Sequence, residues 1–213
     1  MDKKMKPYVV AITGASGAVY GIRLAEVLAE LGKEFTLTIS ESAKTVIREE
    51  LNIDLGDLRK PKLGLLFQPH VLNKFSYYHY SDFTAPIASG SFPTEGMLIV
   101  PCSTTTLARI AAGISQTLIE RAAECMIKEE RKLVLVPRET PLSAIHLENM
   151  LKLARLGVAM VPAMPGFYAG LKTIEETVDF VVGKALDSIQ IPHGLFRRWV
   201  GSVRIQSEKL EGN

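Results

Sequence analysis

An apolar run that leads directly into a glycine-rich turn constrains the fold of this chain more than any other feature. Residues 8–12 are apolar and rich in β-branched side chains, and the segment Gly14–Ala18 follows almost at once. From Ile22 to Leu31 apolar side chains recur at helical spacing, and Gly32 closes the segment. This order predicts a buried strand, a tight turn and a helix, which is the repeating unit of an α/β fold with a parallel sheet.

The same alternation continues along most of the chain. The sequence predicts further strands at 35–39, 97–100, 133–136 and 158–161, and helices from 41 onward and over 104–112, 117–129, 143–155 and 173–189. Residues 52–96 contain four prolines and predict loops with one short strand near 72–78. The pattern indicates an α/β protein, a Rossmann or flavodoxin-like three-layer sandwich with a mostly parallel sheet. We expect one domain over 1–191 and a tail over 192–213 that packs on a neighbouring subunit.

Composition excludes several classes of protein. With 213 residues, of which 47% are hydrophobic and 23% charged, the chain has the balance of a globular protein. Its net charge of +2 and the lack of a basic stripe argue against a general nucleic-acid binder. Two cysteines exclude a disulfide scaffold and a four-cysteine zinc site, and the four histidines show no metal-ligand spacing. No segment reaches the ~18 consecutive apolar residues of a membrane span, so we expect a cytoplasmic protein.

Polar and glycine-rich segments follow several of the predicted strands. In parallel sheets, ligands bind beyond the carboxyl ends of the strands. Free backbone N–H groups in the turn Gly14–Gly17 favour an anion, although a plain tight turn explains this short motif equally well. The hydroxyls of Ser103–Thr106 suit a phosphate, with helix capping as the structural alternative. A phosphate held here without many fixed cations fits flavin mononucleotide (FMN).

Charged side chains could complete this edge of the sheet. Arg138 and Glu139 follow a predicted strand, where they would either anchor an anion and move a proton or form an exposed ion pair. Arg121 and Lys128 lie seven residues apart on one predicted helix, hence on one face, and Lys184 lies on the last helix. Several cations around one cleft would suit a second phosphate, although each alone is a typical surface charge.

The cysteines and histidines give weaker signals. Cys102 follows a strand without an identifiable histidine base, so a small buried residue is the better interpretation than a nucleophile. Cys125 lies on a helix among alanines and is expected in the core. His146 is predicted in the middle of a helix with a packing role.

At these segments the sequence resembles the flavin prenyltransferase (UbiX-like) family. The matching stretches are TGASGA (13–18), ASGS (88–91), PCSTTT (101–106), IERAAE (119–124), KLVLVPRETPLSAIHLENMLKLARLG (132–157) and PAMPGFY (162–168), within about residues 7–192. The resemblance implies a metal-independent transferase that joins a dimethylallyl group from dimethylallyl monophosphate to nitrogen 5 and carbon 6 of reduced FMN. It also implies prenylated FMN as product, a UbiD-like decarboxylase that receives it, and a homo-oligomer, a dodecamer, with active sites shared between subunits.

The resemblance assigns roles to individual positions. FMN would be bound by Gly14, Ala15, Ser16, Ser40, Ser103, Thr104, Thr105, Thr106 and Arg138. The donor would be bound by Arg121, Lys128, Arg138, Glu139, Tyr168 and Lys184. The catalytic residues would be Ser16, Glu139 and Tyr168, with Ser16 relaying the proton from flavin nitrogen 5 and Glu139 assisting departure of the phosphate.

Two positions depart from the pattern of the family. Lys184 stands where arginine is common, which keeps the charge but loses the bidentate fork. Thr105 stands where glycine is common, which adds a side chain to the loop beside the flavin. Trp199 lies in the tail, where members often carry a tryptophan.

Two other functions deserve comparison. A flavoprotein decarboxylase acting on peptidyl- or pantothenoyl-cysteine would need asparagine where this chain has Pro165, and a histidine that the segment Val19–Glu30 lacks. An FMN carrier or accessory subunit of a decarboxylase would keep the flavin motifs but would not need Lys128, Glu139 and Tyr168, which are all present. A flavin prenyltransferase is therefore the function that accounts for the most residues.

Overall fold

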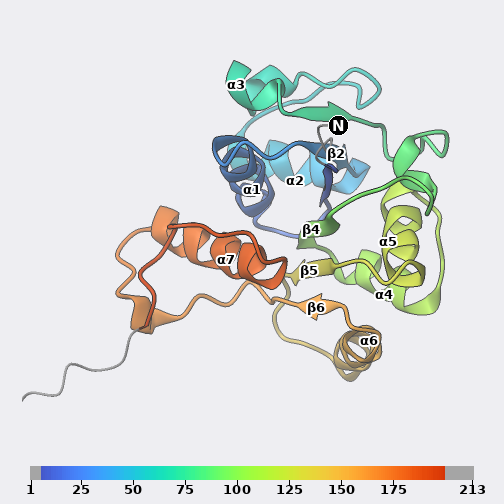
Figure 1. Cartoon of the computed structure of the whole chain (residues 1–213). Helices are drawn as coiled ribbons and strands as arrows, with labels where there is room; N and C mark the ends of the chain where they lie inside the picture. The colour runs from blue at the N-terminus through green and yellow to red at the C-terminus, as the bar shows by residue number, and fades with distance from the viewer. Residues whose placement is uncertain (1–5, 200–213) are drawn as a thin grey trace, which may run out of the picture.

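One six-stranded sheet organises the chain, as the computed structural model shows for residues 6–199 (Figure 1). The strands are β1 (Tyr8–Ile12), β2 (Phe35–Ile39), β3 (Phe75–Tyr77), β4 (Gly96–Cys102), β5 (Leu133–Pro137) and β6 (Ala159–Met160). Their order is β3-β2-β1-β4-β5-β6, and every pairing is parallel. The predicted α/β class is confirmed, and the strand order places β1 and β4 at the centre.

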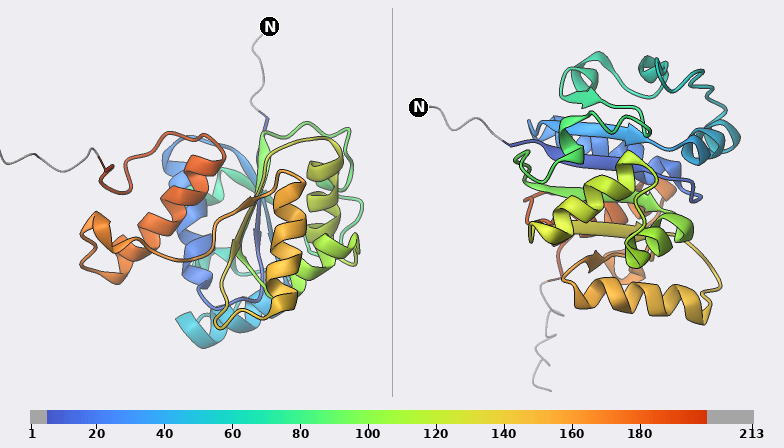
Figure 2. Two further views of the ribbon diagram at one scale, coloured as in Figure 1. Left: turned by 90° about the horizontal axis from the view of Figure 1, so that it is seen from below. Right: turned by 90° about the vertical axis from the view of Figure 1, so that its right-hand side faces the viewer.

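Helices cover both faces of the sheet and produce three layers (Figure 2). The α-helices are α1 (Ala18–Glu30), α2 (Glu41–Leu51), α3 (Pro69–Leu72), α4 (Thr104–Ala112), α5 (Leu118–Lys128), α6 (Ala144–Arg155) and α7 (Ile174–Ser188). Three short 3₁₀ helices, η1 (Leu63–Leu65), η2 (Pro86–Ala88) and η3 (Phe167–Ala169), lie in the connections. Helices α1 and α7 pack on one face, and α4, α5 and α6 pack on the other.

The two cores explain why the central strands are apolar throughout. Val10 and Ile12 of β1 point into the core under α1 and α7, whereas Val9 and Ala11 point into the core under α4 and α5. All four side chains are 0% exposed. A parallel strand with a helix layer on each side has no solvent face, so it shows no alternation of polar and apolar residues.

The structure changes two of the local expectations. His146 is the third residue of α6 rather than a mid-helix residue, and its ring accepts from the backbone N–H of Ser143, in a capping box. Residues 192–199, the first part of the predicted tail, pack on α7 of the same chain. Residues 200–213 lie outside the described part of the chain, so packing of the remaining tail on a neighbouring subunit stays a prediction.

Within residues 6–199, no helix combines the length and the apolar character required to traverse a bilayer.

Candidate functional site

The loops that follow β1, β2 and β4 are tied together at the carboxyl edge of the sheet. Thr13, directly after β1, is 1% exposed, and its hydroxyl donates to the carbonyl of Pro101 at 2.8 Å. The same hydroxyl accepts from the backbone N–H of Ser103 at 2.7 Å. The backbone N–H of Ser40 donates to Ile12 at 3.0 Å. Three of the segments predicted to bind FMN are thus held side by side.

The glycine turn is closely packed against the start of α2. A Cβ atom at Gly14 would overlap the Ser42 side chain, and Gly17 has a φ of 98°, a conformation that favours glycine. The carboxylate of Glu50, at the end of α2, accepts from the backbone N–H groups of Gly17 and Ala18, each at 3.0 Å. A carboxylate of the chain itself therefore occupies these two N–H groups at the start of α1, and binding of FMN by Gly14, Ala15 and Ser16 stays a prediction.

Glu50 is a site residue that the sequence analysis missed. It lies 33 residues from Gly17 along the chain and belongs to no recognised motif. Only the packing of α2 beside α1 brings the two together. Glu50 fixes the turn Gly14–Gly17, so that the side chain of Ser16, which is exposed, is presented at the edge of the sheet.

Ser40 and Ser103 both cap the helices that follow them. The Ser40 hydroxyl accepts from the Ala43 N–H at 3.1 Å, and the Ser103 hydroxyl accepts from the Thr106 N–H at 3.2 Å. Helix capping therefore accounts for Ser103, and binding of a phosphate by the cluster Ser103–Thr106 stays a prediction. Thr106 is 9% exposed and accepts from Ser103 at 3.0 Å, whereas Thr104 is half-buried and Thr105 is exposed. The hydroxyls of Thr104 and Thr105, which cap no helix, lie at the N-terminus of α4, where anions are favoured.

Arg138 joins β5 to this group of loops. Its Nε donates to the carbonyl of Ser16 at 3.1 Å, across 122 residues of sequence. Tyr20, on the first turn of α1, lies close enough to Arg138 to feel its charge. Burial raises the pKa of the Tyr20 phenol, and the positive charge of Arg138 partly offsets that rise. A guanidinium group therefore stands directly over the glycine turn.

Arg138 and Glu139 line a pocket of about 400 Å³ that opens beside the glycine turn. Its other walls are largely apolar and come from Pro137, Thr140, Leu142, Met150, Pro162, Ala163 and Met164. One Glu139 oxygen accepts from the N–H of Thr140 at 3.0 Å, which orients the carboxylate. The pocket combines one cation, one carboxylate and an apolar lining, as a site for a small phosphate ester with an apolar tail requires.

Lys184 and Tyr168 belong to a second group around α7. Lys184 lines a groove of about 340 Å³ together with Pro162 and Met164, which also line the Arg138 pocket. Tyr168, on η3, packs edge-on against Phe180 of that groove with ring centroids 5.9 Å apart. We call Tyr168, Phe180, Lys184 and Trp199 the α7 cluster.

Arg121 and Lys128 lie elsewhere. Arg121 donates to the carbonyl of Ala88 at 3.0 Å and pairs with Glu124 at 2.9 Å. Lys128 ends α5 just before β5 begins, so it lies toward the amino ends of the strands, and it pairs with Glu129 at 2.8 Å. Neither occurs among the described residues that line the Arg138 pocket. The single cleft predicted for all the cations is therefore not formed within one chain.

Comparison with known proteins identifies the family. The Flavoprotein family model matches residues 1–186. The flavin prenyltransferase UbiX of Halalkalibacterium halodurans is 54% identical over 192 residues, which cover 90% of this chain and 92% of the relative. The chain belongs to the flavin prenyltransferase family. The resemblance and the enzyme class expected from the sequence are thereby confirmed.

Solved structures of relatives agree with this membership of the flavin prenyltransferase family. A crystal structure of AnUbiX in complex with FMN and dimethylallyl pyrophosphate is 40% identical, with a TM-score of 0.81, and covers 94% of this chain and 100% of that one. A dodecameric FMN-dependent UbiX-like decarboxylase from Escherichia coli is 44% identical, with a TM-score of 0.80. The match covers 92% of this chain and 100% of that one. The expectation of an FMN-binding protein is borne out at the level of the family. A PPC decarboxylase at 17% identity and a TM-score of 0.57 shares the fold alone.

The remaining candidate groups of this family member are structural. Cys102 and Cys125 are both buried, as expected, and burial raises the pKa of the Cys102 thiol. Among residues 6–199, His, Cys, Asp and Glu side chains form no group of three that could hold a metal ion.

Thr13→Val is expected to lower the free energy of unfolding by about 1–3 kcal/mol, because it leaves the half-buried N–H of Ser103 without its acceptor. The measurement is urea unfolding. The matched control is Thr38→Val: Thr38 is equally buried, and its hydroxyl has no hydrogen-bond partner among the described residues. Equal losses in the two variants would contradict the proposed link between the β1 and β4 loops.

Proposed function

We propose that this chain transfers the dimethylallyl group of dimethylallyl monophosphate to reduced FMN, with new bonds at flavin nitrogen 5 and carbon 6. The product, prenylated FMN, serves a UbiD-like decarboxylase. The observation that carries the proposal is the contact between Arg138 and Ser16, because it places the charged pair Arg138–Glu139 beside the loops that fit FMN.

The residues at the carboxyl edge fit a flavin phosphate. The exposed or half-buried hydroxyls of Ser16, Thr104 and Thr105 and the guanidinium of Arg138 provide donors around one edge. The absence of a side chain at Gly14 allows the turn to lie against Ser42. Reduced FMN supplies an electron-rich ring that accepts the allylic carbon. The Ser16 hydroxyl, which is exposed, would relay the proton from flavin nitrogen 5 to water.

The residues of the Arg138 pocket act on the donor. Arg138 offsets the negative charge that grows on the phosphate as the carbon–oxygen bond breaks. Glu139 delivers a proton to the departing phosphate. The apolar walls, including Leu142, Met150 and Pro162, keep water away from the allylic cation.

A neighbouring subunit completes the donor site with Arg121 and Lys128. In support, Arg121 contacts the loop 88–91 through the carbonyl of Ala88, Arg131 fixes the same loop through the carbonyls of Gly90 and Phe92 at 2.6 and 2.7 Å, and Ser89 and Ser91 of this loop are exposed. The two hydroxyls are 2.8 Å apart. A dodecameric relative at 44% identity makes a shared site feasible.

The test is anaerobic incubation of the purified protein with reduced FMN and dimethylallyl monophosphate, followed by the mass of the extracted flavin. We expect a gain of one five-carbon prenyl unit. A parallel reaction with dimethylallyl diphosphate shows which of the two donors is used. Adding the extracted flavin to a UbiD-like decarboxylase and measuring its activity shows whether that enzyme receives the product. Unmodified FMN with both donors would favour an FMN carrier instead.

Mixing two inactive variants tests whether the site is shared. In the proposed site, one subunit contributes Lys128 and its neighbour contributes Glu139. Lys128→Ala inactivates the first contribution and Glu139→Gln the second. When the two are dissociated, mixed and reassembled, about a quarter of the sites regain both groups, because chains combine at random in a symmetric oligomer. Mixing Arg138→Ala with Glu139→Gln is the control, since both changes fall in the same half of the site. Equal recovery in the two mixtures, or none in the first, would contradict a shared site.

A further inference from the structure

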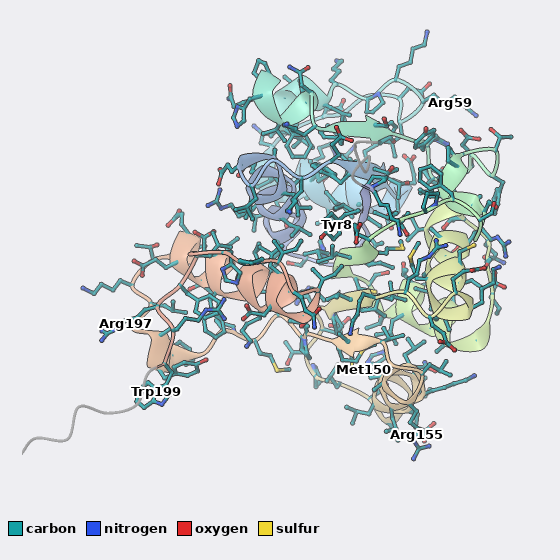
Figure 3. The ribbon with its side chains drawn as sticks, viewed as in Figure 1. Tyr8, Arg59, Met150, Arg155, Arg197 and Trp199 are labelled. Atoms are coloured by element: carbon teal, nitrogen blue, oxygen red, sulfur yellow. The ribbon has the colours of Figure 1, made fainter. Side chains whose placement is uncertain are left out.

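The segment that follows α7 folds back onto the helix through close ring packing. The ring of Phe196 lies 4.8 Å from that of Phe180, and the His193 ring lies 5.4 Å from Phe196. A Cβ atom at Gly183 would overlap both His193 and Phe196, so this approach requires the glycine. Figure 3 labels Arg197 and Trp199 of this segment, on the side of the molecule away from Met150 of α6.

One carboxylate, that of Asp187 on the last turn of α7, holds the segment in place. The guanidinium of Arg198 binds both Asp187 oxygens, at 2.6 and 2.7 Å. The imidazole of His193, which is 1% exposed, lies 3.1 Å from one of them. A bidentate contact of this kind fixes orientation as well as distance. Hydrogen bonding by Arg198 holds the pKa of the Asp187 carboxyl below its usual range, so the contact persists through neutral pH and is lost only in acid.

Two contacts of this carboxylate connect it to the α7 cluster, one through Arg198 and one directly to Lys184. Arg198 directly precedes Trp199, whose ring packs edge-on against Tyr168 at 6.3 Å. On the other side, the ammonium group of Lys184 lies 3.6 Å from Asp187. Because Arg198 binds both Asp187 oxygens at shorter range, Asp187 keeps the Lys184 ammonium group nearby without fully neutralising it, and the charge of Lys184 stays available to a phosphate.

We propose that Asp187 is a positioning residue of the donor site: it docks the segment 192–199, and with it Trp199, and at the same time sets the place of the Lys184 ammonium group. This inference rests on the proposed function and on the donor-binding role that the resemblance to the family assigns to Lys184 and Tyr168. It adds Asp187 and Arg198, neither of which lines the Arg138 pocket or the Lys184 groove, to the residues that determine donor affinity.

Trp199 reports on docking without any assay of activity, because it is the single tryptophan of the chain. Trp199 is 66% exposed in the docked segment, so Asp187→Asn and Arg198→Ala, which both release the segment, are expected to shift its emission modestly to longer wavelength and to raise its quenching by acrylamide about 1.5-fold. Arg198→Lys keeps the positive charge but loses the bidentate contact, so its emission wavelength and quenching should lie between those of the wild type and Arg198→Ala. Arg197→Ala is the matched control, an exposed arginine on the same segment. Unchanged emission in both releasing variants would overturn the inference.

Kinetics separate positioning from a merely structural role. Asp187→Asn and Arg198→Ala should raise KM for dimethylallyl monophosphate about ten-fold and leave KM for FMN unchanged, because the FMN loops lie on other elements. Equal changes in both KM values, or none in that of the donor, would overturn the inference. If the wild-type protein forms no prenylated flavin, the proposed function fails on its own. A titration of Trp199 emission with dimethylallyl monophosphate then still shows whether the variants bind it more weakly, and equal affinity would refute the positioning role.

Discussion

Glu139→Gln is expected to slow prenyl transfer by at least about 10²-fold, because the amide cannot donate a proton to the departing phosphate. The dissociation constant for FMN should change little, since Glu139 lines the donor pocket and Arg138 makes the contact with the glycine turn. The measurements are the rate of mass gain of the flavin under anaerobic conditions and a fluorescence titration with FMN.

Glu148→Gln is the matched control for Glu139→Gln, because it makes the same chemical change at an exposed position of α6. We expect wild-type activity from it. If Glu139→Gln reacted at the wild-type rate, or if it lost FMN affinity and activity together, Glu139 would not be the proton donor of the transfer step.

Gly21→Ala is expected to lower the free energy of unfolding by about 1–3 kcal/mol, the usual cost of overpacking a core. Intrinsic helix propensity alone predicts the opposite, a gain of about 1 kcal/mol for alanine in place of glycine inside a helix. The structure decides the sign: a Cβ atom at Gly21 would overlap the backbone oxygen of Val100 and the side chain of Ile12. Helix α1 lies that close to β1 and β4 only because the residue is glycine.

Gly64→Ala is the control, because nothing lies within 4 Å of its added Cβ atom. This change should leave stability unchanged or raise it slightly. Urea unfolding of both variants measures the difference. The added methyl group should displace α1, and α1 starts at the glycine turn. Gly21→Ala should therefore also bind FMN more weakly. A more stable Gly21→Ala variant would show that the close contact between α1 and β4 is not needed.

Local patterns were enough to predict the elements. The strand Tyr8–Ile12 has the predicted boundaries and the helix after Ser40 begins where predicted, because a parallel strand buried on both faces and a capped helix leave strong local signals. The short strand predicted near 72–78 is β3, Phe75–Tyr77. His146 was misplaced within its helix because a capping box formed by serine and histidine lacks the usual Glu or Gln.

The candidate site was only partly predictable. Arg138 and Ser16 were both candidates from the strand-end rule, but their contact across 122 residues depends on how β5 lies relative to β1. Glu50 carried no sequence signal at all. Arg121 and Lys128 were correctly placed on one helix, yet that helix lies beside the loop at Ala88 and not at the Arg138 pocket.

The sequence by itself determined the α/β class, the order of strands and helices and the family, because burial periodicity, turn residues and motifs are all local in the chain. The tertiary structure alone decided which loops meet. It placed Arg138 over the glycine turn, filled the first amides of α1 with the Glu50 carboxylate, and separated the predicted cations into three groups. Contacts between residues far apart in sequence depend on sheet order and helix packing, and no local pattern specifies either.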